Sequence, residues 1–297
     1  MNWFVALLFI VLACPTLVEA QTPGLKSPTS TVVDLPMLFR GPEPAVEVMV
    51  NGQGPFLFAI DTGATDEARV DSSLVERLGL RIIGTDTGND GSGKDTIRVG
   101  VVRLNSLSVG GLAFHNVNAA TRDFNRLNLP HIDGILTFDL FRDYLFTLDY
   151  PAKRVRLERG ELPKADGAEI LRLKRVHSHP AVDIMIGSER VTAEIDSGNV
   201  GHEFLFPASL VEKLSLATKP VSIGKARTIT HEFELKEARL KANIRLGKYE
   251  FTQPLISFPA PFPFANIGSK LLNQFAITFD QKNDRVRFVR HDINERN

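Results

Sequence analysis

The sequence predicts a mostly β protein built by duplication, with two pseudo-symmetric lobes, a short helix in each, and a cleft between them. Two short strings carry the prediction, Asp61-Thr62-Gly63 and Asp196-Ser197-Gly198, and each follows an apolar run. Each string also precedes a segment of the form Ser-Leu-Val-Glu-Arg/Lys-Leu-x-Leu. Around them, short apolar runs alternate with Gly, Pro and polar turns, a pattern typical of strands.

The duplication is visible because matching segments recur in the same order at a nearly constant spacing. Residues 44–50 match 180–186, 73–80 match 209–216, 147–149 match 278–280, and 154–156 match 285–287. Collinear matches of this kind indicate one unit present twice. They predict an N-terminal lobe over residues 33–160 and a C-terminal lobe over residues 168–290.

The N-terminal residues 1–20 are expected to be a signal peptide. Trp3 to Ala13 form an apolar run, and Val18-Glu19-Ala20 offers small residues for a signal peptidase. We expect cleavage after Ala20, export to the periplasm or the medium, and a linker over residues 21–32. The single cysteine, Cys14, lies in a stretch that loosely resembles a lipoprotein box, so a form attached to the membrane through Cys14 is the alternative.

Within each repeat, the residue pattern predicts strands around one helix. Strands are expected at 46–50, 56–60, 182–186 and 191–195, and a hairpin near each repeat's end begins at 144–149 and 275–280. The apolar spacing predicts helices over Ser72–Leu80 and Ala208–Leu216, with second helical turns at Leu140-Phe141 and Leu271-Leu272.

The overall charge excludes one class of partner. The chain has 297 residues with 35 Lys+Arg and 35 Asp+Glu, so its net charge is zero. Without a basic stripe, no nucleic-acid partner is expected.

Two short motifs suggest ligands that the sequence does not support. Gly88–Lys94 fits the phosphate-loop pattern, but Asp95 replaces the residue that would bind magnesium, so no nucleotide is expected. His177-Ser178-His179 lacks further zinc ligands at a suitable spacing, so no metal site is expected.

Two equivalent aspartates in a duplicated fold suggest a specific chemistry. Carboxylates held a few ångströms apart share one proton, so that one acts as a base while the other acts as an acid. A water between them can be deprotonated as it attacks a carbonyl, without metal or cofactor. We expect Gly63 and Gly198 to turn the chain with positive φ and approach the carboxylates closely. The hydroxyls of Thr62 and Ser197 can cross-link the loops through the opposite lobe's backbone.

These motifs resemble the pepsin and retropepsin family of aspartic proteases, in the two-lobed single-chain form of some exported bacterial proteins. The resemblance lies in Gly54–Ala64, in Glu194–Gly198, and in the lobe ends at 132–157 and 266–288. It covers nearly the whole chain after the linker, and it implies a retropepsin-like acid-protease fold in each lobe.

The resemblance also implies a function. Asp61 and Asp196 would be the catalytic pair of an endopeptidase, Thr62 and Ser197 the grip between the lobes, and the loop around Gly91, Ser92 and Gly93 a flap. The expected partner is a peptide or protein substrate, and the chain is expected to act as a monomer whose lobes form an intramolecular pseudo-dimer. The alternative is a peptide- or protein-binding module that keeps the fold without turnover.

The sequence departs from the family pattern in places that differ between the repeats. The family favours two hydrophobic residues and a Gly behind each Asp loop, whereas this chain has Ile135-Leu136-Thr137 and Asn266-Ile267-Gly268. Asn199 follows the second string, where Ser, Thr or Ala is commoner. Phe258–Phe264, rich in Pro and Phe, either packs under the second Asp loop or forms an apolar wall for a substrate.

Overall fold

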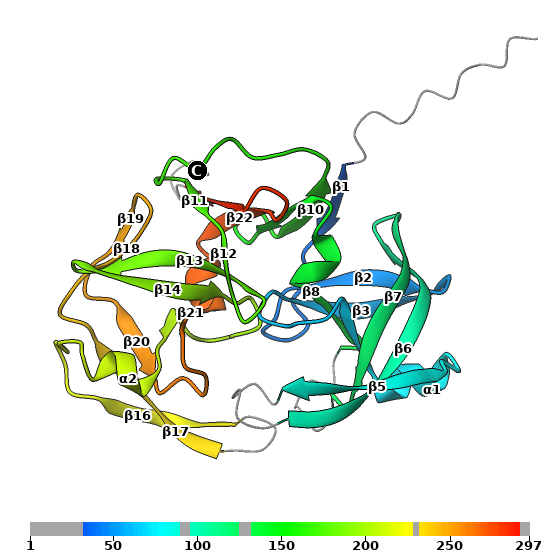
Figure 1. The fold of residues 1–297 in the computed structure, drawn as a ribbon, viewed down its shortest axis with the longest axis horizontal. Coiled ribbons are helices and arrows are strands. Elements are labelled where there is room, and N and C mark those ends of the chain that lie inside the picture. Colours follow the sequence, from blue (N-terminus) through cyan, green and yellow to red (C-terminus); the bar gives the residue numbers. More distant parts are fainter. Residues whose placement is uncertain (1–31, 90–95, 125–131, 228–231, 292–297) are drawn as a thin grey trace, which may run out of the picture. The chain divides into compact units, whose positions relative to one another are not determined.

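A computed structural model of the protein describes residues 32–89, 96–124, 132–227 and 232–291. Three sheets make up the fold, and Figure 1 shows their arrangement. The described residues include no helix long and apolar enough to cross a membrane. The predicted flap residues Gly91, Ser92 and Gly93 lie outside the described residues.

The first half of the chain forms a seven-stranded sheet in the order β2-β3-β8-β4-β7-β6-β5. Its strands are β2 (Ala45–Val50), β3 (Gln53–Asp61), β4 (Ala68–Asp71), β5 (Ile82–Asn89), β6 (Thr96–Val109), β7 (Leu112–Arg122) and β8 (Gly134–Thr137). Helix α1 (Ser72–Arg77) follows β4, and the Asp71 carboxylate caps it by accepting a hydrogen bond from the Ser73 N–H. The 3₁₀ helix η1 (Phe138–Phe141) follows β8.

The second half of the chain forms a ten-stranded sheet. Its main path runs β16-β17-β20-β15-β21-β14-β13-β18-β19, and β12 pairs with β13. The strands are β12 (Lys174–Val176), β13 (His179–Ile186), β14 (Glu189–Ile195), β15 (Phe204–Leu205), β16 (Val221–Arg227), β17 (Glu232–Arg239), β18 (Ile244–Leu246), β19 (Tyr249–Phe251), β20 (Leu255–Phe258) and β21 (Ala265–Ile267). Helices α2 (Ala208–Val211) and α3 (Ser269–Leu272) are single turns.

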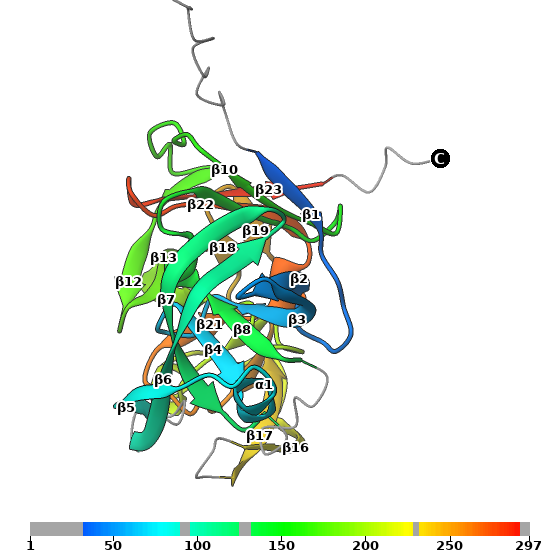
Figure 2. The ribbon, with the colours of Figure 1, turned by 90° about the vertical axis from the view of Figure 1, so that its right-hand side faces the viewer.

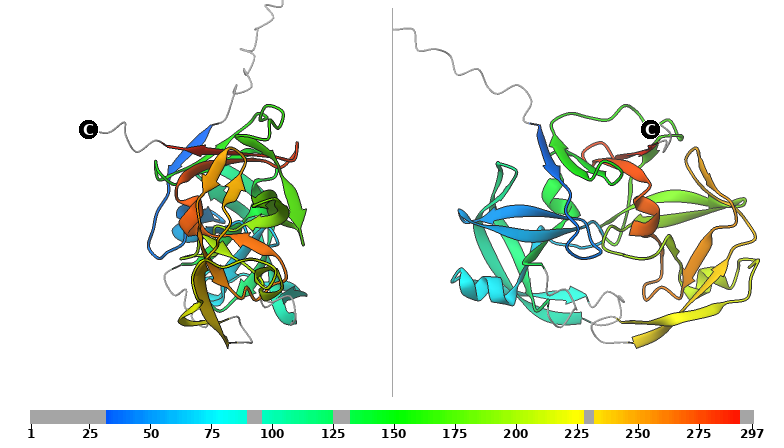
Figure 3. Two further views of the ribbon diagram at one scale, coloured as in Figure 1. Left: turned by 90° about the vertical axis from the view of Figure 1, so that its left-hand side faces the viewer. Right: turned by 180° about the vertical axis from the view of Figure 1, so that it is seen from behind.

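A six-stranded sheet joins the two halves. Its order is β1-β10-β9-β22-β23-β11, and it holds β1 (Val33–Pro36), β9 (Leu145–Asp149), β10 (Arg154–Glu158), β11 (Ile170–Arg172), β22 (Phe275–Asp280) and β23 (Arg285–Arg290). At its centre β9 pairs with β22, and the equivalent residues Thr147 and Thr278 face each other with their hydroxyls 2.9 Å apart. Seen from behind, the halves lie side by side beneath this sheet (Figure 3).

One hydrophobic core runs through both halves and the shared sheet. Its largest side chains are phenylalanines with almost no exposed surface, among them Phe138, Phe146 and Phe279. Phe138 and Phe146 both pack against Phe279, with ring centroids 5.1 Å and 5.8 Å apart. The chain carries its lone cysteine outside the described residues, so the described fold is held by packing and hydrogen bonds. The mostly β, duplicated fold predicted from the sequence is therefore confirmed.

Two details differ from the predicted elements. The helix expected over Ala208–Leu216 ends at Val211, because the next amides bond three residues back, Lys213 to Leu210 and Leu214 to Val211, as in a tighter turn. The second half also carries its own hairpin, β16–β17, at the place that β5–β6 occupies in the first half. Both hairpins lie on the side opposite the six-stranded sheet (Figures 1 and 2).

Candidate active site

Asp61 and Asp196 stand at the ends of two internal strands, β3 and β14. Asp61 is the last residue of β3, which pairs with β2 on one side and in parallel with β8 on the other. Asp196 directly follows β14, which pairs with β13 and in parallel with β21. Each aspartate is therefore fixed by a strand that has hydrogen-bonded neighbours on both edges.

Thr62 and Ser197 lock the two aspartate loops together through four reciprocal hydrogen bonds. The Thr62 N–H donates to Ser197 Oγ at 3.0 Å, and the Ser197 N–H donates to Thr62 Oγ1 at 3.0 Å. The Thr62 hydroxyl donates to the Ile195 carbonyl at 2.7 Å, and the Ser197 hydroxyl donates to the Ile60 carbonyl at 2.8 Å. Both side chains are fully buried. The predicted cross-link between the loops is present in the structure.

The two glycines bring each loop against the opposite carboxylate. A Cβ added to Gly63 would lie 2.5 Å from Cγ of Asp196, and a Cβ added to Gly198 would lie 2.5 Å from Cγ of Asp61. Their N–H groups donate to the Asp61 and Asp196 carboxylates of their own loops, both at 2.9 Å. The expectation of positive φ at both glycines was wrong, because neither adopts it. Glycine is needed here for close approach rather than for a left-handed turn.

The two aspartates differ in their hydrogen bonds. Asp61 Oδ1 accepts from the Gly63 N–H. Asp196 Oδ1 accepts from the N–H groups of Gly198 and Asn199, and Asp196 Oδ2 accepts from the Asn266 side-chain amide at 2.8 Å. Asn199 in turn donates its side-chain amide to Asn266 Oδ1 at 2.7 Å. The two departures from the family pattern, Asn199 and Asn266, therefore support one another beside Asp196.

The surroundings favour the protonated form of Asp196. Burial raises the pKa of Asp196 well above its usual range, and the charges of Glu194 and Asp61 raise it further, while the Asn266 and Gly198 hydrogen bonds oppose the change. Burial also raises the pKa of Glu194, against the opposing effect of His179. Three carboxyl groups thus influence one another here, and Glu194 has almost no exposed surface.

The departure at Thr137 is accommodated without disturbing the loop. Thr137 is fully buried, and its hydroxyl donates to the carbonyl of Asp66. At the equivalent place in the second half, a Cβ on Gly268 would lie 2.5 Å from the His202 carbonyl oxygen and 2.8 Å from that of Asn199. A glycine is therefore required at this place only in the second half, where the backbone carbonyls of His202 and Asn199 lie close to Gly268.

The Pro- and Phe-rich loop packs against the second half. Ala260 and Phe262 join Leu205 and Leu235 in a small apolar cluster. Phe262 stacks on Phe264 with ring centroids 4.7 Å apart. Of the two interpretations that the sequence left open, these contacts support packing.

Sequence reasoning missed three groups close to the aspartates. Glu194 is buried two residues before Asp196, and its Oε1 lies 2.6 Å from Nδ1 of His179, at an angle that suits an ion pair rather than a hydrogen bond. Tyr150 is buried near Ser197 with its hydroxyl lacking a well-aligned hydrogen-bond partner in the described structure. A charged residue at the place that Ala59 takes in the first repeat was the available signal for Glu194; Tyr150 offered none.

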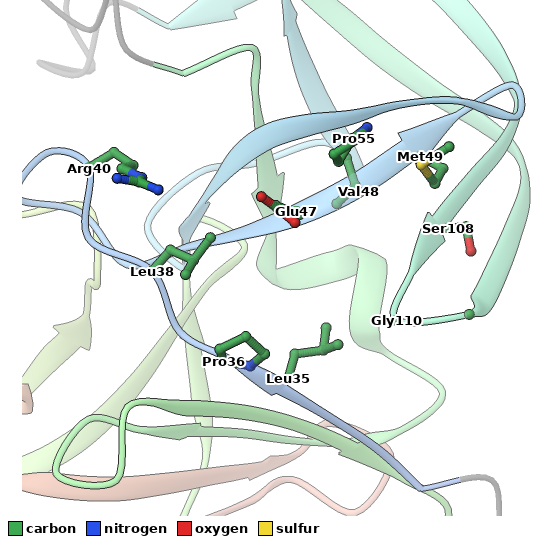
Figure 4. A pocket seen from close by; sticks show the side chains of 11 residues that line it. Leu35, Pro36, Leu38, Arg40, Glu47, Val48, Met49, Pro55, Ser108 and Gly110 are labelled. Carbon is green, nitrogen blue, oxygen red and sulfur yellow. The ribbon is translucent and has the colours of Figure 1, made fainter.

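A separate cavity lies in the first half, away from the aspartates. It has a volume of about 380 Å³ and is lined mostly by apolar residues, including Leu35, Leu38, Val48 and Met49 (Figure 4). Arg40 and Glu47 are its charged lining residues. The cavity holds none of the residues discussed above and has no part in the chemistry of the pair.

Comparisons with known proteins agree with this site. The family model described as aspartyl protease matches residues 46–140, which include Asp61, Thr62 and Gly63. The predicted resemblance to aspartic proteases is thereby confirmed over these residues. Among solved structures, the chain is similar to a retropepsin-like aspartic protease from Rickettsia conorii, with 17% identity and a TM-score of 0.33, over 44% of this chain and 93% of that one. No curated protein gives a significant match.

Proposed function

We propose that the protein is an aspartic endopeptidase, in which a water held between Asp61 and Asp196 attacks a peptide bond. One observation carries the proposal: each aspartate carboxylate lies against the glycine of the opposite loop, and buried Thr62 and Ser197 hold the loops in that position. This arrangement supports a short separation of the two carboxyl groups, which sharing a proton requires.

The difference between the aspartates assigns their roles. The pKa of Asp196 is raised by its surroundings, so we assign the shared proton to Asp196 and the role of base to Asp61. Asp61 accepts a proton from the water while the water oxygen bonds to the carbonyl carbon, and Asp196 donates its proton to the developing oxyanion. Collapse of the tetrahedral intermediate breaks the C–N bond: the amine leaves with the proton held by Asp61, and Asp196 takes back a proton from a hydroxyl of the intermediate, which restores the pair.

The substrate class follows from the surface of the hairpins. Strands β5 and β16 lie at the edges of their sheets, so each presents unpaired backbone groups to an added strand. Both carry exposed apolar side chains, Ile82 and Ile83 on β5 and Val221 and Ile223 on β16. These features support an extended peptide with apolar side chains as substrate. Export directed by residues 1–20 and action as a monomer stay predictions.

The test is cleavage of an unfolded protein between about pH 3 and 7, the range in which a carboxyl pair holds one proton. The new termini are identified by mass spectrometry, with Asp61→Asn and Asp196→Asn purified in parallel. The proposal predicts defined internal cleavage by the wild type and none by either variant. Equal cleavage by wild type and variants would contradict it, and binding of a peptide without cleavage would favour the alternative of a binding module.

A further inference from the structure

A buried polar row lies behind Asp196. The parallel pairing of β14 with β21 sets Glu194 beside Asn266. The Asn266 amide nitrogen donates to Glu194 Oε2 at 3.1 Å and to Asp196 Oδ2 at 2.8 Å. The other oxygen of Glu194 lies 2.6 Å from Nδ1 of His179. The row therefore runs from His179 through Glu194 and Asn266 to the Asp196 carboxylate.

The first half of the chain provides an internal comparison. There the parallel pairing of β3 with β8 sets Ala59 beside Ile135, in the register that Glu194 and Asn266 occupy in the second half. Ala59 and Ile135 are both buried and apolar. The fold thus supports an aspartate loop without any polar row. A buried carboxylate is costly, and an apolar replacement is often at least as stable, so a structural role does not explain the row.

We propose that Glu194 and Asn266 are positioning residues with opposite effects on Asp196: Glu194 favours the shared proton on Asp196 rather than on Asp61, whereas Asn266 orients the Asp196 carboxylate and favours its ionised form. Glu194 places a negative charge behind Asp196 and so favours the neutral form of that carboxyl group. Asn266 fixes the rotamer of Asp196 through its Oδ2, and His179 Nδ1 lies 2.6 Å from the other carboxylate oxygen of Glu194. The catalytic consequence rests on the proposed function, whereas the placement of the proton does not.

Other titratable groups lie on the segments that pack near the Asp196 loop. Asp61 faces it across the loops, and Tyr150 lies near Ser197. His202 bonds through Nδ1 to Ser257 Oγ at 2.8 Å, and Ser257 donates to Glu237 at 3.0 Å. Lys270 approaches Glu203 at 3.9 Å. Glu194 is distinguished from these groups because a single side chain, Asn266, bonds to it and to Asp196.

The test follows the carboxyl carbons of Asp61 and Asp196 by NMR through a pH titration of the full chain. Three variants are compared with the wild type. Glu194→Gln keeps the shape and removes the charge, Asn266→Ile introduces the residue of the first half, and Glu189→Gln changes an exposed glutamate on the same strand as the matched control. Should Asn266→Ile not fold, Asn266→Ala removes the same donor.

The proposal predicts opposite effects. Glu194→Gln shifts loss of the shared proton to lower pH because a negative charge has gone, whereas Asn266→Ile shifts it to higher pH because the ionised Asp196 has lost a donor. Glu189→Gln leaves the titration unchanged. The proposal is overturned if Glu194→Gln titrates like the wild type, or if both variants shift in the same direction.

The same variants separate this proposal from the proposed function. If the wild type cleaves peptides, the fall of kcat/KM at high pH shifts in each variant by as much as its NMR titration does. At a pH about one unit above the midpoint of this fall in the wild type, Glu194→Gln has about tenfold lower kcat/KM than the wild type. If the wild type cleaves nothing, the proposed function fails, and the NMR titration still decides where the proton lies.

Discussion

At the scale of single residues, Gly63 and Gly198 determine how closely the two aspartates meet. Each glycine lies where a Cβ would stand 2.5 Å from the opposite carboxylate. Neither carboxylate can move away freely, since each accepts a hydrogen bond from the N–H of its own loop, and Asp196 is also held by Asn266. A methyl group at either glycine must therefore push the loops apart.

Gly63→Ala should accordingly weaken both activity and stability. A displacement of the pair by about 1 Å should lower kcat/KM about 100-fold, and the overpacking should cost about 1–3 kcal/mol of unfolding free energy. Denaturant titration and steady-state kinetics measure the two effects. Gly84→Ala is the matched control for stability, because its Cβ meets nothing within 4 Å and its φ is ordinary. A Gly63→Ala variant with the same unfolding free energy as Gly84→Ala would show that the loops are not in close contact.

Residue roles could be predicted from the sequence only where they follow from local pattern. The paired strings are local, so Asp61 and Asp196 could be matched by counting along the chain. The row behind Asp196 depends on the register of β14 with β21 and on contacts between residues far apart in sequence. The unusual Asn266 could be noticed, but nothing local indicated that it bonds to both Glu194 and Asp196.

At the scale of elements, the loops after β3 and β14 behave as one unit. The hydroxyls of Thr62 and Ser197 each accept from one buried N–H and donate to one buried carbonyl of the opposite loop. Removing either hydroxyl leaves two buried backbone groups without a partner, which is more costly than losing an exposed hydrogen bond. The grip is therefore expected to stabilise the whole fold as well as the site.

Thr62→Ala and Ser197→Ala should each lower the unfolding free energy by about 1–3 kcal/mol. Because the two side chains share one network, the unfolding free energy lost in the double variant should differ from the sum of the two single losses. Thr62→Ser keeps the hydroxyl and should retain most of the stability. Urea unfolding of the four proteins beside the wild type measures these changes, and values for both alanine variants within error of the wild type would refute the grip.

The elements themselves were largely predictable, with limits that have physical reasons. Alternation of apolar and polar residues predicted the strands around each aspartate because one face of each is buried. The same pattern could not fix where the helix after Pro207 ends, since tightening into three-residue turns depends on neighbouring packing. The β16–β17 hairpin was not predicted, because its sequence has no glycine-rich string like that of residues 88–93.

At the scale of the whole molecule, the site makes the stability of the fold depend on pH. The pKa values of Asp196 and Glu194 are raised on folding, mainly by burial. A folded state that holds extra protons is most stable below the unfolded pKa, about 4 for both groups, and loses that stability as pH rises through the folded pKa values. Both groups therefore destabilise the fold toward neutral pH.

Asp196→Asn should remove part of the loss of folding stability that occurs as the pH rises toward neutral. The variant should melt at a higher temperature than the wild type at pH 7, and the difference should shrink as the pH falls toward about 3, below the unfolded pKa, where Asp196 is mostly protonated in both the folded and the unfolded chain. Calorimetry across this pH range measures it. Asp284→Asn, at an exposed turn, serves as the control and should follow the wild type. A wild type and an Asp196→Asn variant that melt together at every pH would contradict the burial of this carboxyl group.

The architecture of the whole molecule followed from the repeats. Because matched segments recur in order, the pairing of β3 with β8 could be expected to recur as β14 with β21, and the structure contains both. The six-stranded sheet that joins the halves was not foreseen as one sheet, since its central pairing of β9 with β22 links residues more than a hundred positions apart.

The central claim is that Asp61 and Asp196 together activate one water. Its most direct test is kcat/KM on one defined peptide substrate for the wild type, Asp61→Asn and Asp196→Asn at the pH of maximal activity. The account predicts that each single substitution lowers kcat/KM about 1000-fold or more, because neither carboxyl group can serve as both acid and base. Activity within about tenfold of the wild type in either variant would contradict it.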